Sequence, residues 1–369
     1  MKKFKVTHLT SAHPRYDTRI FIKECVSLAK VEEYSLSLIV ADGLGNEEKD
    51  GVKIFDVGKL NGRINRIFKT TKKVFEKAKE LDSDIYHFHD PELIPVGLRL
   101  KKLGRKVIFD IHEDIPKQIN AKSYINPFLR GILSKLYESY ENLTCKKFDC
   151  LIVPTPLIKD KFTSLHSNVV QVTNYPIVKE LVNSIPWAVR KNHICYIGSL
   201  AQARGIKELV KSLEQSKVIL DLCGDFRPKS LEVELKKTEG WKYVDFHGFI
   251  SRNEVKEVLS SVKIGMVTLH PTKSYLEAIP VKMFEYMAAG IPIIASDFKL
   301  YQELLNGYDC ALFVDPLNPE AIAEAVVRLL EDENKAQLMG ESGKKAVLEN
   351  FNWTEEEIKL INIYRGLLK

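Results

Sequence analysis

The alternation of short β-branched runs with amphipathic stretches constrains this chain more than any other feature. Two series of expected strands follow one another, at residues 5–9, 36–41, 52–57, 84–88, 107–111, 151–153 and 169–172, and then at 193–197, 218–223, 244–247, 264–269, 292–295 and 312–314. This pattern is typical of parallel sheets covered by helices on both faces, because crossover helices bury both sides of each strand. A chain of 369 residues is long enough for two such domains.

A polar, proline-bearing stretch at residues 174–192 separates the two series. We therefore predict an α/β protein with two doubly wound, Rossmann-like domains, residues 1–180 and 181–352, facing each other across a cleft. A further helix is expected within residues 353–369. In open sheets of this kind ligands bind beyond the carboxyl ends of the strands, so the functional residues are expected in the strand-end loops.

The positive charge is concentrated in the first half of the chain. Residues 1–180 carry a net charge of +8 and the remainder −2. Much of the excess lies in an amphipathic helix expected within residues 59–79, whose basic residues are Arg63, Arg66, Lys69, Lys72, Lys73 and Lys77. Two interpretations stay open. The apolar stripe of this helix packs on its own domain, or the helix contacts an anionic membrane or a phosphate-bearing acceptor.

Several other classes of protein are disfavoured. The sequence has no apolar run near the ~20 residues that cross a bilayer, and its first residues lack the hydrophobic region of a signal peptide. We expect a cytoplasmic protein, with association to the cytoplasmic face of a membrane left open. No nucleic-acid recognition module is present, so nucleic acid is not an expected partner. The 6 cysteines are scattered without a C-x2-C pair, which argues against a zinc or redox motif.

The most informative stretch surrounds an expected helix within residues 280–290. Glu277 and Glu285 lie eight residues apart around its start, with Lys282 between them. A carboxylate can accept hydrogen bonds from a diol such as a ribose, whereas a lysine and helix-terminal amides suit a diphosphate. The residues therefore suit a ligand that carries a diol, such as a ribose, and a diphosphate or sugar hydroxyls.

This stretch, which reads P-V-K-M-F-E-Y-M-A-A-G-I-P from Pro280, resembles the Glu-x7-Glu signature of glycosyltransferase family 4, whose members are retaining enzymes with the GT-B fold. Tyr196-Ile197-Gly198-Ser199-Leu200, followed by Arg204-Gly205, is similar to the opening of the donor-binding domain of that family. The resemblance also implies that the last helix, residues 353–369, crosses back to the first domain.

The resemblance assigns roles in the second domain. Arg204 and Lys282 would hold the donor diphosphate, Glu285 the ribose hydroxyls and Glu277 the donor sugar. The remaining donor-binding residues would be Gly198, Ser199, Ile279 and Val281. The sequence departs from the family at Ser199, where many members have arginine or glycine, and at residues 278–280, where many have glycines whose amides reach the sugar. Because Pro280 has no amide hydrogen, the identity of the donor sugar cannot be transferred from the family.

Two strand ends in the first domain carry histidines. Phe109-Asp110-Ile111-His112-Glu113 resembles the segment in which a family histidine faces the reacting sugar. In His87-Phe88-His89-Asp90, alternation places both histidines on one face of a strand, which is one way to begin a metal site. We find no later cluster with ligand spacing that completes it, so no metal site is expected. His89 and Asp90 are expected to line the acceptor side of the site.

The loop after the first expected strand, residues 10–21, lacks the glycines that many family members have there. We expect Ser11 and His13 to face the acceptor. An equally good interpretation gives Asp17 and Arg19 structural roles at the start of the helix.

The sequence thus predicts a hexosyl-transferring, retaining glycosyltransferase that uses a nucleotide-sugar co-substrate and no cofactor or divalent metal. His112 would contact a sugar hydroxyl, and the leaving phosphate oxygen would accept the proton of the acceptor hydroxyl. UDP is the expected nucleotide, with GDP-mannose next, and the acceptor is expected to be a glycan or lipid-linked molecule in bacterial surface polysaccharide assembly. The alternatives are a GT-B sugar-nucleotide epimerase, a non-catalytic sugar-binding protein and a metal-dependent hydrolase built on His87, His89 and Asp90.

Overall fold

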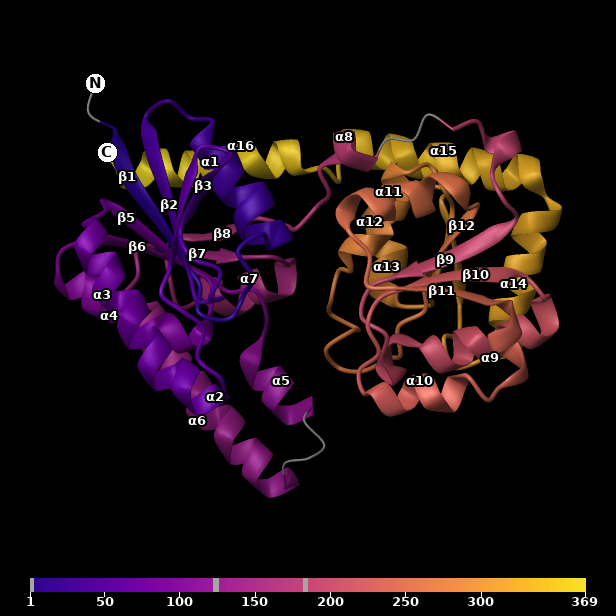
Figure 1. The fold of residues 1–369 in the computed structure, drawn as a ribbon, viewed down its shortest axis with the longest axis horizontal. Coiled ribbons are helices and arrows are strands. Elements are labelled where there is room, and N and C mark those ends of the chain that lie inside the picture. The colour runs from indigo at the N-terminus through magenta and orange to yellow at the C-terminus, as the bar shows by residue number, and fades with distance from the viewer. Residues whose placement is uncertain (1–2, 122–125, 182–184) are drawn as a thin grey trace. The chain divides into compact units, whose positions relative to one another are not determined.

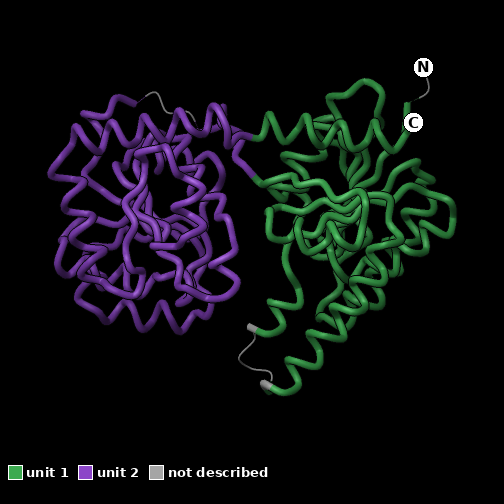
Figure 2. The backbone as a smooth tube through the Cα atoms, turned by 180° about the vertical axis from the view of Figure 1, so that it is seen from behind, with its two compact units in different colours: residues 1–174, 353–369 green, residues 175–352 purple. Residues whose placement is uncertain are grey.

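The computed structural model describes residues 3–121, 126–181 and 185–369. The chain forms two compact units, unit 1 from residues 1–174 and 353–369, and unit 2 from residues 175–352 (Figure 2). The expected boundary at residue 180 is therefore displaced, because residues 175–180 belong to unit 2. Residues 182–184 of the expected linker lie outside the described residues.

Unit 1 is built on an eight-stranded sheet of order β3-β4-β2-β1-β5-β6-β7-β8 (Figure 1). Its strands are β1 (Phe4–Leu9), β2 (Tyr34–Val40), β3 (Glu47–Lys49), β4 (Val52–Asp56), β5 (Ile85–Phe88), β6 (Lys106–Asp110), β7 (Cys150–Val153) and β8 (Val169–Gln171). All strand pairs are parallel except β3 with β4. Only β3 was not expected from the sequence, since its residues, Glu-Glu-Lys, have no apolar alternation.

The helices of unit 1 connect these strands. They are η1 (Thr18–Cys25), α1 (Val26–Ala29), α2 (Arg63–Asn65), η2 (Arg66–Thr70), α3 (Thr71–Leu81), η3 (Pro91–Leu93), α4 (Ile94–Lys102), α5 (Ile115–Ala121), α6 (Pro127–Cys145), α7 (Pro156–Thr163) and α16 (Trp353–Leu367). The last helix packs against the first residues of the chain, where Trp353 Nε1 donates a hydrogen bond of 2.9 Å to Ser27 Oγ. Unit 1 is thus closed by both ends of the sequence.

Unit 2 contains a six-stranded, wholly parallel sheet of order β11-β10-β9-β12-β13-β14. Its strands are β9 (His193–Ile197), β10 (Ile219–Cys223), β11 (Val244–Gly248), β12 (Ile264–Val267), β13 (Ile293–Ser296) and β14 (Ala311–Val314). Its helices are α8 (Val178–Leu181), η4 (Trp187–Val189), η5 (Gln202–Arg204), α9 (Ile206–Ser216), α10 (Lys229–Leu235), η6 (Glu239–Tyr243), α11 (Arg252–Ser261), α12 (Val281–Ala288), α13 (Lys299–Leu304), α14 (Pro319–Glu331) and α15 (Glu333–Glu349).

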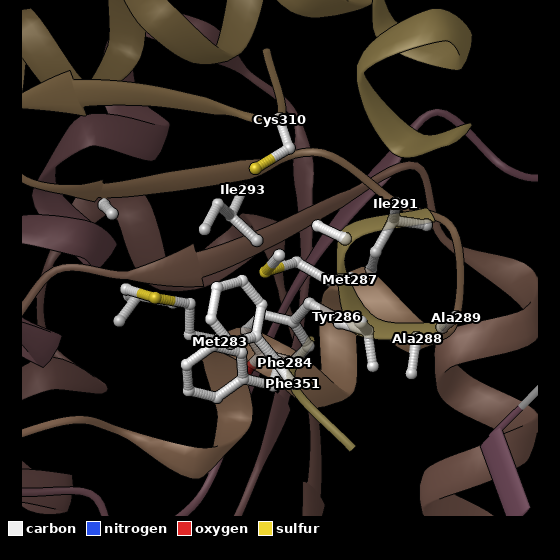
Figure 3. Close-up of a cluster of buried hydrophobic side chains, with 14 of the residues drawn as sticks. Met283, Phe284, Tyr286, Met287, Ala288, Ala289, Ile291, Ile293, Cys310 and Phe351 are labelled. Carbon is white, nitrogen blue, oxygen red and sulfur yellow. The ribbon is translucent and has the colours of Figure 1, made fainter. Parts of the chain in front are cut away.

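Alternate residues of the unit 2 strands enter two separate cores. In β9, Ile194 and Tyr196 join one buried cluster with α9, α10 and α14, while Cys195 and the partly buried Ile197 join another with α11, α12 and α13. Figure 3 shows part of the second cluster, in which the residues of α12 pack against strand and loop residues. Burial on both faces explains why these strands read as continuous apolar runs.

The basic helical stretch of residues 63–81 (α2, η2 and α3) divides into two parts. Val74 and Phe75 of α3 are buried in unit 1, as expected for an ordinary surface helix. Ile64 and Phe68 are instead 75% and 72% exposed. The expectation that the apolar stripe packs on its own domain therefore holds only for the C-terminal part of the stretch.

Helix α6 also carries an exposed apolar face. Its exposed large apolar side chains are Phe128, Leu129, Ile132, Leu133, Leu136, Tyr140 and Leu143. Figure 1 shows α6 extending beyond the sheet of unit 1. Within the described ranges, no helix has the length and hydropathy that a membrane span requires.

The packing of α12 on β12 depends on a glycine. A Cβ atom added to Gly265 would lie 2.2 Å from Cδ2 of Tyr286, whose hydroxyl accepts a 2.9 Å hydrogen bond from the amide of Ile197. Gly265→Ala must displace this buried ring, so we expect the free energy of unfolding, measured by urea denaturation, to fall by about 1–3 kcal/mol.

The control is Gly366→Ala in α16, where an added Cβ would meet no described atom within 4 Å. This change should leave the free energy of unfolding unchanged or slightly higher, because alanine favours the helix. Equal losses in the two variants would contradict the prediction.

Candidate functional site

The two sheets each have one point at which the strand order reverses. In unit 1 this point lies between β1 and β5, and in unit 2 between β9 and β12. The loops that leave adjacent strands in opposite directions there form a crevice at the carboxyl ends of the strands. The residues predicted from the sequence lie at these two places.

In unit 2, close backbone approaches shape the loop after β9. Gly224 has a φ angle of 140°, and its added Cβ would lie 1.8 Å from the carbonyl oxygen of Gly198. Gly205, with a φ angle of 73°, would meet the carbonyl oxygen of Thr268 at 1.8 Å. The chain thus runs so close to its neighbours after β10 and β12 that neither position tolerates a side chain. Gly198, Ser199 and Gly224 line an adjoining cavity of about 210 Å³.

Lys282 is a buried cation in this region. It lies in the first turn of α12, is 7% exposed, and places Nζ 3.3 Å from the ring centroid of Tyr196. Among the described residues, Nζ has no hydrogen-bond partner. Burial, with a contribution from Arg204, lowers the pKa of Lys282 well below its usual value. The site therefore holds a desolvated ammonium group that faces a ring rather than an anion.

Arg204 is the second cation at this place. It ends η5, is half-buried, and its guanidinium lies 5.7 Å from the ring centroid of Tyr275. It is near enough to Lys282 to lower the pKa of the lysine. The structure thus brings together the two residues that the sequence predicted for a diphosphate.

Glu285 has a partner that sequence reasoning missed. Its Oε1 atom accepts a hydrogen bond of 2.5 Å from Nη1 of Arg252, and Arg252 Nε lies 3.1 Å from Glu180 Oε2. Burial alone would lower the pKa of Arg252, but Glu285 and Glu180 raise it. No motif marks Arg252, which is the first residue of α11. A ribose at Glu285 would therefore meet a carboxylate that is already oriented.

The other predicted donor residues precede or begin α12. Glu277 lies half-buried in the loop before the helix, and Val281 is its half-buried first residue. Ile279 packs against the hydrophobic cluster that contains α12. Pro280 is the residue before the first turn, where the lack of an amide hydrogen costs no hydrogen bond.

In unit 1, Asp90 organises the loop after β1. It is 2% exposed and accepts hydrogen bonds from the amide of Ser11 at 2.6 Å and from Thr10 Oγ1 at 2.8 Å. His13 Nδ1 lies 2.9 Å from its other oxygen. Burial alone would raise the pKa of Asp90, but His13 and these hydrogen bonds hold it well below its usual value. Three of the residues predicted for the acceptor side thus contact one another.

Asp110 connects the two other predicted histidines at the end of β6. Its Oδ2 atom lies 2.8 Å from His112 Nε2 and 3.3 Å from His89 Nδ1. Arg19 binds the same carboxylate through two hydrogen bonds of 2.8 and 2.9 Å. Burial alone would raise the pKa of Asp110, but Arg19 and His112 hold it well below its usual value. Arg19 is therefore a buried partner of the site, as well as a residue at a helix start.

A cavity of about 150 Å³ adjoins these groups. Its lining includes His13, His89, Asp90 and His112, together with Glu141 of α6. His112 is the histidine of this group that resembles the family residue facing the reacting sugar. Its side chain is 20% exposed, and Asp110 fixes its ring.

Behind this cavity lies a buried histidine cluster. His8 Nδ1 is 3.0 Å from His89 Nε2, and the hydroxyl of Tyr364 is 2.9 Å from His8 Nε2 and 2.7 Å from His87 Nδ1. His87 and His89 share a face as predicted, with ring centroids 4.5 Å apart. Burial lowers the pKa of His8 and His87, and lowers that of His89 to about 4.

The sequence offers no later cluster that completes a metal site at His87 and His89, but two earlier residues lie beside them in the structure. His8 and Glu24 lie with them, and the potential ligand atoms of the four are within 4.8 Å of one another. Asp90, which the sequence placed with the two histidines, binds the Ser11 and His13 loop instead. His8 and Glu24 occur in no spacing pattern with His87, so only the fold brings them together.

Two Rossmann-like units, each built on a mainly parallel sheet, are the architecture of the GT-B fold. A family model described as Glycosyltransferase Family 4 matches residues 32–174, and one described as Glycosyl transferases group 1 matches residues 178–346. The chain belongs to glycosyltransferase family 4.

Similar proteins agree with this assignment. An uncharacterized glycosyltransferase of Methanocaldococcus jannaschii is 25% identical over 76% of this chain and 75% of its own length. Sucrose-phosphate synthase from Thermosynechococcus elongatus has a TM-score of 0.78 at 17% identity, covering 99% of both chains. Anabaena HepE in complex with UDP-glucose has a TM-score of 0.75 at 14% identity, covering 98% of this chain and 99% of its own.

The burial of Lys282 generates a prediction about stability. Lys282→Met removes a charge whose desolvation is offset only by the face of Tyr196 and not by a hydrogen bond within the described parts of the chain. We expect the ligand-free variant to unfold at a higher temperature than the natural protein at pH 7, by an amount equivalent to about 1 kcal/mol or more. Differential scanning calorimetry measures this difference.

The same difference should depend on pH. The pKa of Lys282 is lowered in the folded protein from its ordinary value of 10.5, so at pH values between the lowered and the ordinary pKa the unfolded chain binds the proton and the folded protein does not. The natural protein therefore gains stability relative to Lys282→Met as the pH rises from 7 towards 10. The exposed Lys211→Met is the control and should show no such trend. A variant less stable than the natural protein at pH 7 would contradict the prediction.

Proposed function

We propose that this glycosyltransferase moves a hexosyl group from a nucleotide-sugar, with UDP as its nucleotide, to a hydroxyl acceptor with retention at the anomeric carbon. The observation that carries this proposal is the pairing of Arg204 with the buried, unpartnered ammonium of Lys282 at the end of β9 in the described structure. A donor diphosphate supplies the anion that these two cations lack. Its charge grows as the sugar leaves, and preorganised cations stabilise that growth most strongly where water is excluded.

The remaining roles follow from the geometry of each unit. In unit 2, Arg252 orients Glu285 to accept hydrogen bonds from the ribose, and Glu277 binds a hydroxyl of the donor sugar. In unit 1, His112, fixed by Asp110, contacts a sugar hydroxyl near the reacting carbon. The departing phosphate oxygen takes the proton of the acceptor hydroxyl, so the reaction needs no enzyme nucleophile. Arg204, Lys282 and the first amides of α12 replace a divalent metal at the diphosphate.

The choice of UDP rests on the similarity of this fold to HepE, whose structure holds UDP-glucose. GDP-mannose is the next candidate donor. A sugar-nucleotide epimerase would use the same nucleotide site but would convert the donor without an acceptor, and a binding protein would leave it unchanged. Product analysis with and without acceptor therefore separates these alternatives.

A thermal-shift panel of UDP, GDP, ADP and CMP tests the donor site. A nucleotide at ~100 times its Kd adds roughly 2.7 kcal/mol to the folded state, which corresponds to roughly 5–10 °C in Tm. We expect the largest shift with UDP, the same shift in EDTA, and its loss in Arg204→Ala. Lys211→Ala, on the exposed side of α9, is the matched control and should keep the shift. A UDP shift that survives in Arg204→Ala, or that EDTA abolishes, would refute the metal-free assignment.

Turnover tests the second part of the proposal. Glu277→Ala should reduce kcat at least 100-fold in variants that still show the UDP shift, because the lost contact acts on the reacting sugar. The anomeric configuration of the product, determined by NMR, should match that of the donor. An inverted product would overturn the retaining mechanism.

We further propose that the acceptor is lipid-linked and that unit 1 docks on an anionic membrane. The support is the exposed apolar side chains of α6 and of residues 64–68, together with the exposed cations Lys69, Lys72 and Lys73, which follow residues 64–68 in the sequence. Apolar side chains flanked by lysines suit a bilayer with acidic headgroups.

This apolar surface borders the candidate acceptor site. Glu92 forms an ion pair with Arg66, whose Nε lies at 2.5 Å, and accepts a hydrogen bond of 3.3 Å from Ser11 Oγ. Burial is the main cause of the raised pKa of Tyr137 on α6, and the charge of Glu92 contributes to it. Glu141, also on α6, lines the cavity beside His13 and His112. A lipid-linked acceptor could thus keep its chain in the bilayer while its polar head reaches the histidines.

Vesicle flotation tests the docking proposal. The protein should bind vesicles with acidic lipids at low salt and bind neutral vesicles more weakly, and 1 M salt should release most of it, because the Debye length then falls to ~3 Å. Leu136→Asp combined with Ile64→Asp should weaken binding at least tenfold. Leu338→Asp on α15, where the natural leucine is equally exposed, is the control. No binding to acidic vesicles, or equal binding by the double variant, would contradict the proposal.

A further inference from the structure

Four buried side chains in unit 1 surround one point. The exposed fractions of His8, Glu24, His87 and His89 are all 0%. Glu24 Oε2 lies at nearly equal distances from three imidazole nitrogens, 4.0 Å from His8 Nδ1, 3.8 Å from His87 Nδ1 and 3.9 Å from His89 Nε2. These distances are too long for hydrogen bonds to Glu24. The nitrogens meet other partners instead, since His8 Nδ1 lies 3.0 Å from His89 Nε2 and His87 Nδ1 lies 2.7 Å from the hydroxyl of Tyr364.

The carboxylate of Glu24 is poorly satisfied for a buried group. Within the described structure neither of its oxygens has a hydrogen-bond partner. Arg19 Nε lies 3.2 Å from Oε1, but the guanidinium is directed at Asp110, which it binds through two hydrogen bonds. His87 Nε2 is also buried without a partner among the described residues. A buried polar group in this state is costly unless a ligand satisfies it.

The separations approach those of ligands around one metal ion. A tetrahedral Zn²⁺ with bonds of ~2.0–2.2 Å keeps its ligand atoms about 3.3–3.5 Å apart. The distances to Glu24 Oε2 exceed this by about 0.5 Å, while His8 Nδ1 and His89 Nε2, at 3.0 Å, are slightly closer. Small rotations of these side chains therefore close a coordination shell without moving the backbone.

The partners of the outer ring nitrogens of His8 and His89 support the same conclusion, whereas the outer nitrogen of His87, Nε2, has no partner among the described residues. A histidine that binds a metal usually donates its other N–H group to an oxygen, which fixes the ring. His8 Nε2 lies 2.9 Å from the hydroxyl of Tyr364, and His89 Nδ1 lies 3.3 Å from the Asp110 carboxylate. Both rings are thus oriented so that the remaining nitrogen faces Glu24.

We propose that His8, Glu24, His87 and His89 bind one structural Zn²⁺ ion in unit 1. Three imidazole nitrogens and one carboxylate oxygen are ligands that zinc accepts, and four protein ligands complete its tetrahedral shell. The ion fastens β1, η1 and β5 together, and through Tyr364 it holds α16 on this side of the sheet. Because the site is fully buried, it stabilises unit 1 and cannot receive substrate, which separates it from a hydrolase centre. This inference does not rest on the proposed transferase mechanism.

The test is metal analysis of the full-length protein, produced without a histidine tag and purified without chelator. Inductively coupled plasma mass spectrometry should find about one equivalent of zinc per chain. Prolonged treatment with a chelator should remove it and lower Tm by at least about 5 °C. Addition of Co²⁺ to the depleted protein should produce the strong visible absorption of a tetrahedral Co²⁺ complex, a readout that requires no variant to fold.

Variants then locate the ion. Glu24→Gln and His87→Gln should lose most of the bound zinc. His247→Asn is the matched control, since His247 belongs to a partly exposed group with Asp221 and Asp245, and it should keep one equivalent. Less than a tenth of an equivalent in the natural protein, both as purified and after addition of Zn²⁺, overturns the proposal. One equivalent that persists in Glu24→Gln and His87→Gln places the ion elsewhere and also overturns it. The UDP thermal shift reports on unit 2, so its failure leaves this result unaffected.

Discussion

The buried carboxylate of Asp110 is the constraint on which the arrangement of unit 1 depends. A charge with no exposed surface at the end of a strand must be paired and hydrogen-bonded. Arg19 supplies the counter-charge from η1, and the rings of His89 and His112 contact the same oxygen from the ends of β5 and β6. Three segments distant in the sequence are therefore held by one group. The pairing that makes the burial tolerable is also what fixes His112 at the edge of its cavity.

Among the residues that the structure describes, the buried charge of unit 2, on Lys282, lacks hydrogen-bonding partners of the kind that Asp110 has in unit 1. Lys282 is also buried, at 7% exposure, yet within the described residues it meets only the face of Tyr196 and the charge of Arg204, which repels it. A fold selected for stability alone would have replaced this lysine by an apolar residue. Its retention is understandable if an anionic ligand completes the site, because the desolvation needed for strong binding is then already present in the empty protein. The proposed affinity for a diphosphate would have the same physical origin as this local cost in stability.

Local patterns in the sequence predicted most of the architecture. The strands of both sheets were found because burial on two faces demands apolar β-branched runs. Glu277, Lys282 and Glu285 were proposed as donor residues from their spacing around one helix, and these roles stay predictions. What the sequence could not show were contacts between distant segments. Arg252 reaches Glu285 from another helix, and Glu24 joins the histidines only after η1 packs on the sheet. The short strand β3 and the exposed face of α6 were missed for a related reason, since hydropathy alone does not tell which neighbour, if any, covers a surface.

The path of the chain adds a constraint that neither unit shows alone. Unit 1 consists of residues 1–174 and 353–369, so all of unit 2 lies between its two parts in the sequence. The last helix contributes the hydroxyl of Tyr364, which bridges His8 and His87 across 356 residues of chain from His8. Until that helix arrives, two buried imidazoles lack their hydrogen-bond partner and the core of unit 1 is incomplete. The stability of unit 1 therefore depends on a helix that follows all of unit 2 in the sequence, so unit 1 cannot complete its core before unit 2 has been synthesised.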